Sequence, residues 1–146
     1  MKKNLPRFLT LATLIFSVLG LLDLVYLTIL HFKNIIPPCT ITQNCETVLT
    51  SQYSVILGIP ISLLGALSFF AVFITGIFYF ETKKRYVLSI LSLIAFLNLL
   101  ISLFFLGIQM FIIKSYCQYC LLVDLSALLI FVFTITLKKT SKTLSF

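Results

Sequence analysis

Residues 55–113 are VILGIPISLLGALSFFAVFITGIFYF, then ETKKR, then YVLSILSLIAFLNLLISLFFLGIQMFII. Both flanking runs are longer than the ~20 apolar residues that a helix needs to cross the hydrocarbon core of a bilayer. Neither run contains a charged residue. The connection between the runs, ETKKR at residues 81–85, is short enough to join two antiparallel helices. The sequence therefore predicts two neighbouring transmembrane helices over residues 55–80 and 86–113.

Two further apolar runs, residues 8–32 and 117–137, flank this hairpin. With 60% hydrophobic and 10% charged residues, the chain of 146 residues is not a soluble domain. The N-terminus shares its basic start with secretory signal peptides, but the run is too long and no small-residue cleavage site follows. We therefore expect an all-α integral membrane protein, a four-transmembrane-helix bundle that forms one domain over residues 1–146.

The basic residues predict the orientation of this bundle. Nine of the eleven lie on one side of the predicted spans, and positively charged loops stay in the cytoplasm. Both termini are therefore expected to be cytoplasmic, and the net charge of +7 does not indicate a nucleic-acid site. The nine residues are Lys2, Lys3, Arg7, Lys83, Lys84, Arg85, Lys138, Lys139 and Lys142.

The longest loop, residues 33–54, is predicted on the opposite, outer side. A pair of prolines near its start cannot continue the first helix. A short helix is expected over about residues 43–52, with Val48 and Leu49 resting on the membrane surface. The loop should thus form a lid over the bundle. The residues that can cap the short helix are Thr42 and Asn44.

All four cysteines fall on this outer side, two in the lid and two where the fourth helix starts. Free cysteines that act only as small apolar residues would be scattered through the spans. Cys117 and Cys120 form a C-x-x-C at a helix start, where exposed N–H groups and the helix dipole favour the thiolate. Cys39 and Cys45 can close a disulfide in the lid, either as a structural staple or as a redox pair. A mobile pair beside a fixed pair is what serial thiol–disulfide exchange needs, and the spacing of the lid pair does not fit a zinc site.

Several longer stretches carry a family resemblance. They are GLLDLVYLT at 20–28, the lid cysteines with VLTS at 48–51, GIPISLLG at 58–65, and YCQYCL at 116–121. Together they resemble the bacterial members of the vitamin K epoxide reductase family over nearly the whole chain.

The resemblance implies a membrane thiol-disulfide oxidoreductase that supports disulfide bond formation in a bacterial inner or plasma membrane. Cys39 would meet a thioredoxin-like or DsbA-like partner, Cys45 would pass electrons to Cys117, and Cys120 would face a quinone of the ubiquinone, menaquinone or vitamin K type. Ser51 matches the family's loop serine or threonine and is a candidate for the quinone site or proton relay, with a cap on the short helix as the alternative. Because the chain stops just past the fourth helix, the partner is expected to be a separate protein.

The chain also departs from the family. Animal members bind the quinone with an asparagine near the second helix and a tyrosine four residues after the second motif cysteine. The second span here has no asparagine, and Asp124 stands at the tyrosine's position. Asp124 lies about 6 Å deeper than Cys120 at 1.5 Å rise per residue, and Asp23 shares its depth. Carboxyl groups at membrane depth are functional candidates, so both are candidate proton relays to the quinone, or else only partners of a neighbouring hydroxyl.

Other functions remain open from the sequence. Reduction of vitamin K or quinone epoxide is the closest alternative, because animal members of the family perform it. A DsbB-type oxidase has the same chemistry, but its C-x-x-C precedes the wider cysteine pair. A cysteine-bearing metal transporter or a structural protein with two disulfide staples belongs to a different class. No metal ligand set is expected.

Overall fold

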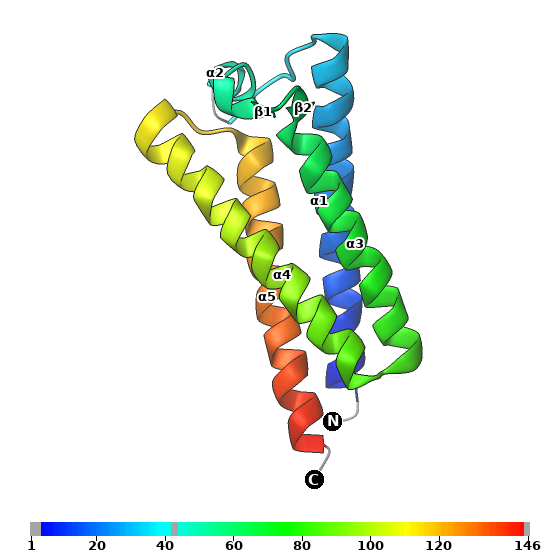
Figure 1. The fold of residues 1–146 in the computed structure, drawn as a ribbon. Helices are drawn as coiled ribbons and strands as arrows, with labels where there is room; N and C mark the ends of the chain where they lie inside the picture. Colours follow the sequence, from blue (N-terminus) through cyan, green and yellow to red (C-terminus); the bar gives the residue numbers. More distant parts are fainter. Residues whose placement is uncertain (1–3, 42–43, 145–146) are drawn as a thin grey trace.

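Four helices dominate the computed structural model, which describes residues 4–41 and 44–144. Within these residues four helical spans are long and apolar enough to cross a membrane. They are α1 (Leu5–Lys33), α3 (Ile61–Thr82), α4 (Arg85–Gly107), which continues as a π-helical segment over Ile108–Ile113, and α5 (Gln118–Leu144). Because α1 and α4 each contact both α3 and α5, every helix has two neighbours in the bundle (Figure 1). The expected all-α membrane bundle is confirmed.

One end of the bundle carries most of the basic residues. The start of α1, the α3–α4 turn and the end of α5 lie together there, and the lid lies at the other end (Figure 1). This is the distribution on which the predicted orientation depends. The described basic residues of this end are Arg7, Lys83, Lys84, Arg85, Lys138, Lys139 and Lys142. Lys2 and Lys3, which belong to the same prediction, lie outside the described residues.

The second transmembrane helix begins later than expected. Residues 55–60 form a hairpin of β1 (Val55–Ile56) and β2 (Ile59–Pro60). Leu57 and Gly58 connect the two strands with φ angles of 53° and 83°. Positive φ at both central residues is the conformation of a tight two-residue hairpin turn, and it cannot continue into a helix. The prediction that the span starts at residue 55 is therefore wrong by six residues, since α3 starts at 61.

The lid packs inward against the bundle. Its helix α2 (Cys45–Leu49) is shorter than expected. Val48 is buried and packs among the cysteines, and both Val48 and Leu49 line the cavity beneath the lid. The expectation that these two side chains rest on the membrane surface is wrong, because the single apolar side of so short a helix covers the interior. Asn44 occupies the N-cap position without a side-chain cap bond, and Thr42 lies outside the described residues.

Glycines bring α1 and α3 close together. A Cβ atom on Gly20 would overlap the ring of Phe69, and one on Gly76 would lie 2.9 Å from the side chain of Leu14. Small residues at helix contacts are the usual means by which membrane helices approach closely. The α1–α3 pair thus forms a tightly packed wall of the bundle.

Candidate redox site beneath the lid

A disulfide joins Cys39 and Cys45, with the two Cα atoms 6.2 Å apart. Cys45 is fully buried, whereas Cys39 is partly exposed. Cys39 Sγ lies 3.7 Å from the carbonyl oxygen of Pro37, a contact that becomes a hydrogen bond only when reduction gives the sulfur a proton. Of the two lid cysteines, Cys39 is therefore the more exposed.

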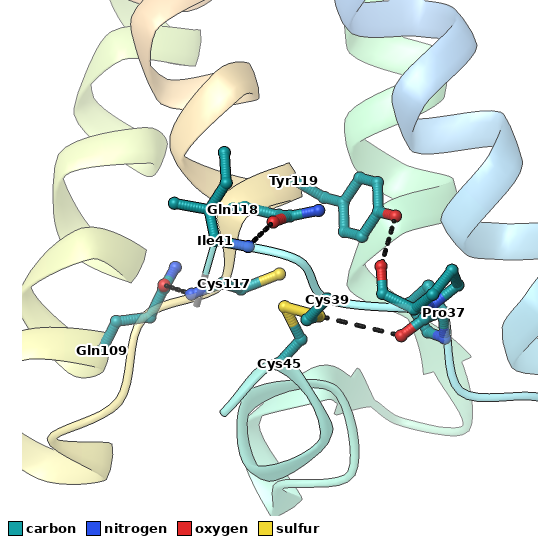
Figure 2. Close-up of a disulfide and its surroundings, with 9 residues drawn as sticks. Pro37, Cys39, Ile41, Cys45, Gln109, Cys117, Gln118 and Tyr119 are labelled. Atoms are coloured by element: carbon teal, nitrogen blue, oxygen red, sulfur yellow. Dashed lines mark hydrogen bonds between the residues drawn. A yellow bond between two sulfur atoms is a disulfide. The ribbon is translucent and has the colours of Figure 1, made fainter. Parts of the chain in front are cut away.

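The second cysteine pair lies directly beneath this disulfide. Cys117 and Cys120 are free thiols. Cys117 is fully buried in one cluster with Cys45 and Val48, and Figure 2 shows its sulfur next to the lid disulfide. Cys120, in the first turn of α5, lines the cavity below. The four cysteines therefore belong to one cluster, which reaches from the partly exposed Cys39 to the cavity.

The pKa of Cys117 is lowered from its ordinary value of 9.0 to about 7. The largest cause is a hydrogen bond from the Cys120 side chain, and the backbone N–H groups of Cys120 and Tyr119 add to it. Burial and the negative charge of Asp23 act in the opposite direction. The N–H contribution was expected from the position at a helix start, whereas the dominant thiol–thiol bond depends on the folded geometry.

The two residues inside the C-x-x-C hold the lid. The Gln118 side-chain oxygen accepts a hydrogen bond from the Ile41 N–H at 3.0 Å, and the Tyr119 hydroxyl donates to the Pro38 carbonyl oxygen at 3.0 Å (Figure 2). The Tyr119 ring also packs on Tyr26 with centroids 5.8 Å apart. Both partners in the lid flank Cys39 in sequence. The motif thus fixes its own cysteines and the lid disulfide in one assembly, a role that its sequence did not reveal.

The π-helical segment that ends α4 supplies a further contact. Its Gln109 is buried and accepts the backbone N–H of Cys117 at 3.2 Å (Figure 2). The backbone carbonyl oxygen of Gln109, unlike the side-chain oxygen that binds Cys117, accepts a hydrogen bond from the N–H of Ser115 at 3.2 Å. This second bond lies within the short turn to α5. Single turns of π-helix recur at functional sites, and this one positions Cys117 under the lid.

A cavity of about 830 Å³ lies between the lid and the bundle. Side chains of α1, α3, α4, α5 and the lid line it, and most of them are apolar. Its size falls within the range of small-molecule sites in proteins. Cys120 and Asp124, one turn apart on α5, both belong to its wall.

Polar groups of three helices gather in this wall. Ser102 on α4 donates a hydrogen bond to Asp124 Oδ1, and Ser68 Oγ on α3 lies 2.7 Å from Asn98 Oδ1 on α4. The remaining polar atoms of the amide and the carboxyl group, Asn98 Nδ2 and Asp124 Oδ2, are buried and have no hydrogen-bond partner among the described residues. An apolar cavity with unsatisfied polar atoms in one wall fits a flat apolar ring that carries oxygen atoms, as a quinone does. Asn98 was missed from the sequence because an amide was sought on the second span, although an amide within the third apolar run was visible.

The two remaining candidates are Ser51 and Asp23, and only Ser51 belongs to the described lining of the cavity. Ser51 lines the cavity, but its hydroxyl donates to the Val48 carbonyl oxygen at 2.8 Å. Asp23 on α1 has a buried Oδ2 with no partner among the described residues, and its negative charge acts to raise the pKa of Cys117. Among the residues that the structure describes, Asp23 is not part of the cavity lining. The structure therefore brings Ser51 and Asp124 to the cavity with Cys120, and leaves Asp23 beside the thiols.

A four-helix membrane bundle, with paired cysteines at one end and an apolar cavity next to them, is the arrangement of a membrane oxidoreductase. The model of the vitamin K epoxide reductase family matches residues 11–135, which include all four cysteines. The chain belongs to that family and is a membrane oxidoreductase. The resemblance drawn from the sequence is thus confirmed. A comparison with curated proteins gave no match.

Proposed function

We propose that this protein oxidises a thioredoxin-like or DsbA-like protein on the outer face of a bacterial inner or plasma membrane and passes the electrons to a quinone. In this proposal both termini lie in the cytoplasm. The observation that carries it is the burial order of the four sulfurs. Cys39 is partly exposed, Cys45 and Cys117 are buried together, and Cys120 lines the cavity.

The first exchange takes place at the lid. A thiolate of the partner attacks Cys39, and its second thiol then resolves the mixed disulfide. The partner leaves with a disulfide, and the lid pair is left as two thiols, so two electrons and two protons have been transferred. Because Cys39 is the more exposed sulfur, it is the one that a protein thiol can reach.

The second exchange moves the electrons inward. The Cys45 thiolate attacks Cys117 of an oxidised inner pair, Cys120 leaves as a thiolate, and Cys39 then displaces Cys117 from Cys45. The lid disulfide is restored and the inner pair is a dithiol, which is the state that the structure holds. A thiol with a low pKa leaves readily, so the lowered pKa of Cys117, about 7, favours this displacement.

The inner dithiol is reoxidised at the cavity. Forming the Cys117–Cys120 disulfide releases two electrons and two protons, the same number that reduction of a quinone to a quinol consumes. The quinone is the electron acceptor. Cys120 lines the cavity, where its sulfur can deliver the electrons, and Asp124 one turn deeper is placed to hold and deliver a proton.

Thiol trapping in membranes depleted of quinone tests the proposal. With a reduced partner present, we expect Cys117 and Cys120 to accumulate as thiols, and added quinone should convert them to a disulfide. If the inner pair becomes oxidised equally well without quinone, the proposed electron acceptor is wrong.

The order of transfer has its own test. Cys120→Ser removes the resolving thiol, so the Cys117 thiolate should attack the lid disulfide and accumulate as a Cys45–Cys117 mixed disulfide. Non-reducing peptide mapping detects this bond, and Cys117→Ser is the matched control that cannot form it. Loss of activity in Cys120→Ser without the mixed disulfide contradicts the proposed order.

A further inference from the structure

The side chains of Ser68 and Asn98 form a polar pair in the wall of a cavity whose lining is mostly apolar. Ser68 Oγ lies 2.7 Å from Asn98 Oδ1 and 2.8 Å from the Gly65 carbonyl oxygen. A hydroxyl has one proton to donate, so it can satisfy only one of these two acceptors at a time. The pair therefore has two hydrogen-bonded arrangements.

In the first arrangement the Ser68 hydroxyl donates to the Asn98 oxygen. The amide nitrogen is then left as a free donor, and it is this atom that is buried without a partner. In the second, Ser68 donates to Gly65 and accepts from the Asn98 amide nitrogen, which leaves the amide oxygen as a free acceptor. The terminal torsion of asparagine is soft, so exchange between the two arrangements needs only rotation of the amide and of the Ser68 hydroxyl.

An unpaired amide is costly where water cannot reach it, and more so at membrane depth. Asn98 lines the cavity together with Ser102, one turn and about 6 Å further along α4 at 1.5 Å rise per residue. Ser102 is already engaged with Asp124. Two atoms among the described residues of this wall then remain unpaired, Asp124 Oδ2 and the Asn98 amide nitrogen. Asn98 is the amide of the two, and a polar atom of a ligand in the cavity can satisfy it.

We propose that the Asn98 carboxamide, held by Ser68, binds a ring oxygen of the quinone and of the quinol alike. The amide donates to a quinone oxygen in the first arrangement and accepts from a quinol hydroxyl in the second. This assignment rests on the proposed function and specifies the site that would hold its acceptor. It gives Asn98 the task of orienting the ring, while the thiols and Asp124 carry electrons and a proton.

Binding of a short-chain naphthoquinone, labelled with carbon-13 at its ring carbonyls, to the purified full-length protein tests the assignment. Asn98→Leu removes both polar atoms at similar size. We expect it to weaken binding of both the quinone and the quinol by ~5- to 10-fold, the loss that one net hydrogen bond represents. Infrared spectra of the bound quinone should show one carbonyl band moving to the frequency of a carbonyl without a hydrogen bond.

Two further variants complete the experiment. Ser68→Ala keeps the amide but removes its anchor, so the carbonyl band should move part of the way. Ser92→Ala changes a buried serine on the same helix that does not belong to the described lining of the cavity, and it should leave affinity and spectrum unchanged.

The results separate the two levels of the proposal. If the quinone binds to Asn98→Leu and Ser68→Ala with unchanged affinity and an unchanged carbonyl band, the role of Asn98 is wrong while the proposed function stands. If the naphthoquinone does not bind to the unaltered protein, the proposed function is contradicted and the assignment of Asn98 with it.

Discussion

The reactivity of Cys117 provides a quantitative test of the site geometry. The hydrogen bond from the Cys120 side chain is the largest cause of its lowered pKa, so Cys120→Ala should raise that pKa. Cys39→Ala and Cys45→Ala are included in the background, because otherwise Cys117 would form a mixed disulfide with the lid. When Cys120→Ala is added to this background, Cys117 is the only cysteine left in the sequence.

The expected size of the effect follows from the pKa. At pH 7 a thiol with a pKa of about 7 is about half thiolate, whereas at the ordinary value of 9.0 it is about 1% thiolate. If the Cys120 bond accounted for the whole shift, the thiolate fraction would fall about 50-fold. In the variant two backbone N–H groups still lower the pKa, while burial and the charge of Asp23 still raise it, so we expect a fall of this order.

The pH dependence of alkylation by a small neutral reagent measures this pKa, because only the thiolate reacts. The rate should reach half its maximum near pH 7 when Cys120 is present, and at a clearly higher pH in Cys120→Ala. Cys120→Ser is the matched control, since its hydroxyl can still donate to the Cys117 sulfur and should keep the midpoint closer to 7. A midpoint that stays near 7 in Cys120→Ala would refute the thiol–thiol bond as the main cause.

Two predictions concern the ends of the electron path. Cys39→Ala should abolish turnover with the protein partner but spare reduction by a small membrane-permeant dithiol, which reaches the inner pair without the lid; equal loss in both assays would make Cys39 a structural residue. Asp124→Asn keeps the shape and the bond from Ser102 but cannot release a proton, so quinone turnover should fall by ~100-fold, the low end of acid–base contributions. The same variant should lose the pH dependence of turnover while its inner disulfide still forms with a soluble oxidant. Unchanged turnover across pH would mean that Asp124 has only a structural role, through its hydrogen bond with Ser102.

The length of the apolar runs made the membrane bundle predictable, because a bilayer imposes a minimum length on each helix. The start of α3 was missed. A local turn at Leu57 and Gly58 outweighed the continuous apolar pattern, which cannot distinguish a short hairpin from the first turns of a helix. The direction of Val48 was missed for a similar reason, since an apolar side chain near the membrane can face lipid or protein.

The cysteine chemistry was predictable in kind but not in arrangement. The helix-start C-x-x-C and the second pair identify thiol exchange at one membrane face. Their order of burial, and the hold of Gln118 and Tyr119 on the lid, depend on contacts between segments about 80 residues apart in sequence.

By itself the sequence determined that four helices cross the membrane and that two cysteine pairs meet at one end. Only the tertiary structure decided which polar side chains share the cavity wall: Asp124 with Ser102, and Asn98 with Ser68. The physical reason is that these helices are apolar on every side, so their sequences carry no periodicity that distinguishes the face toward lipid from the face toward the bundle. Rotation of each helix is settled by packing, through close contacts such as Gly20 against Phe69, and that packing is what turns isolated polar residues into a site.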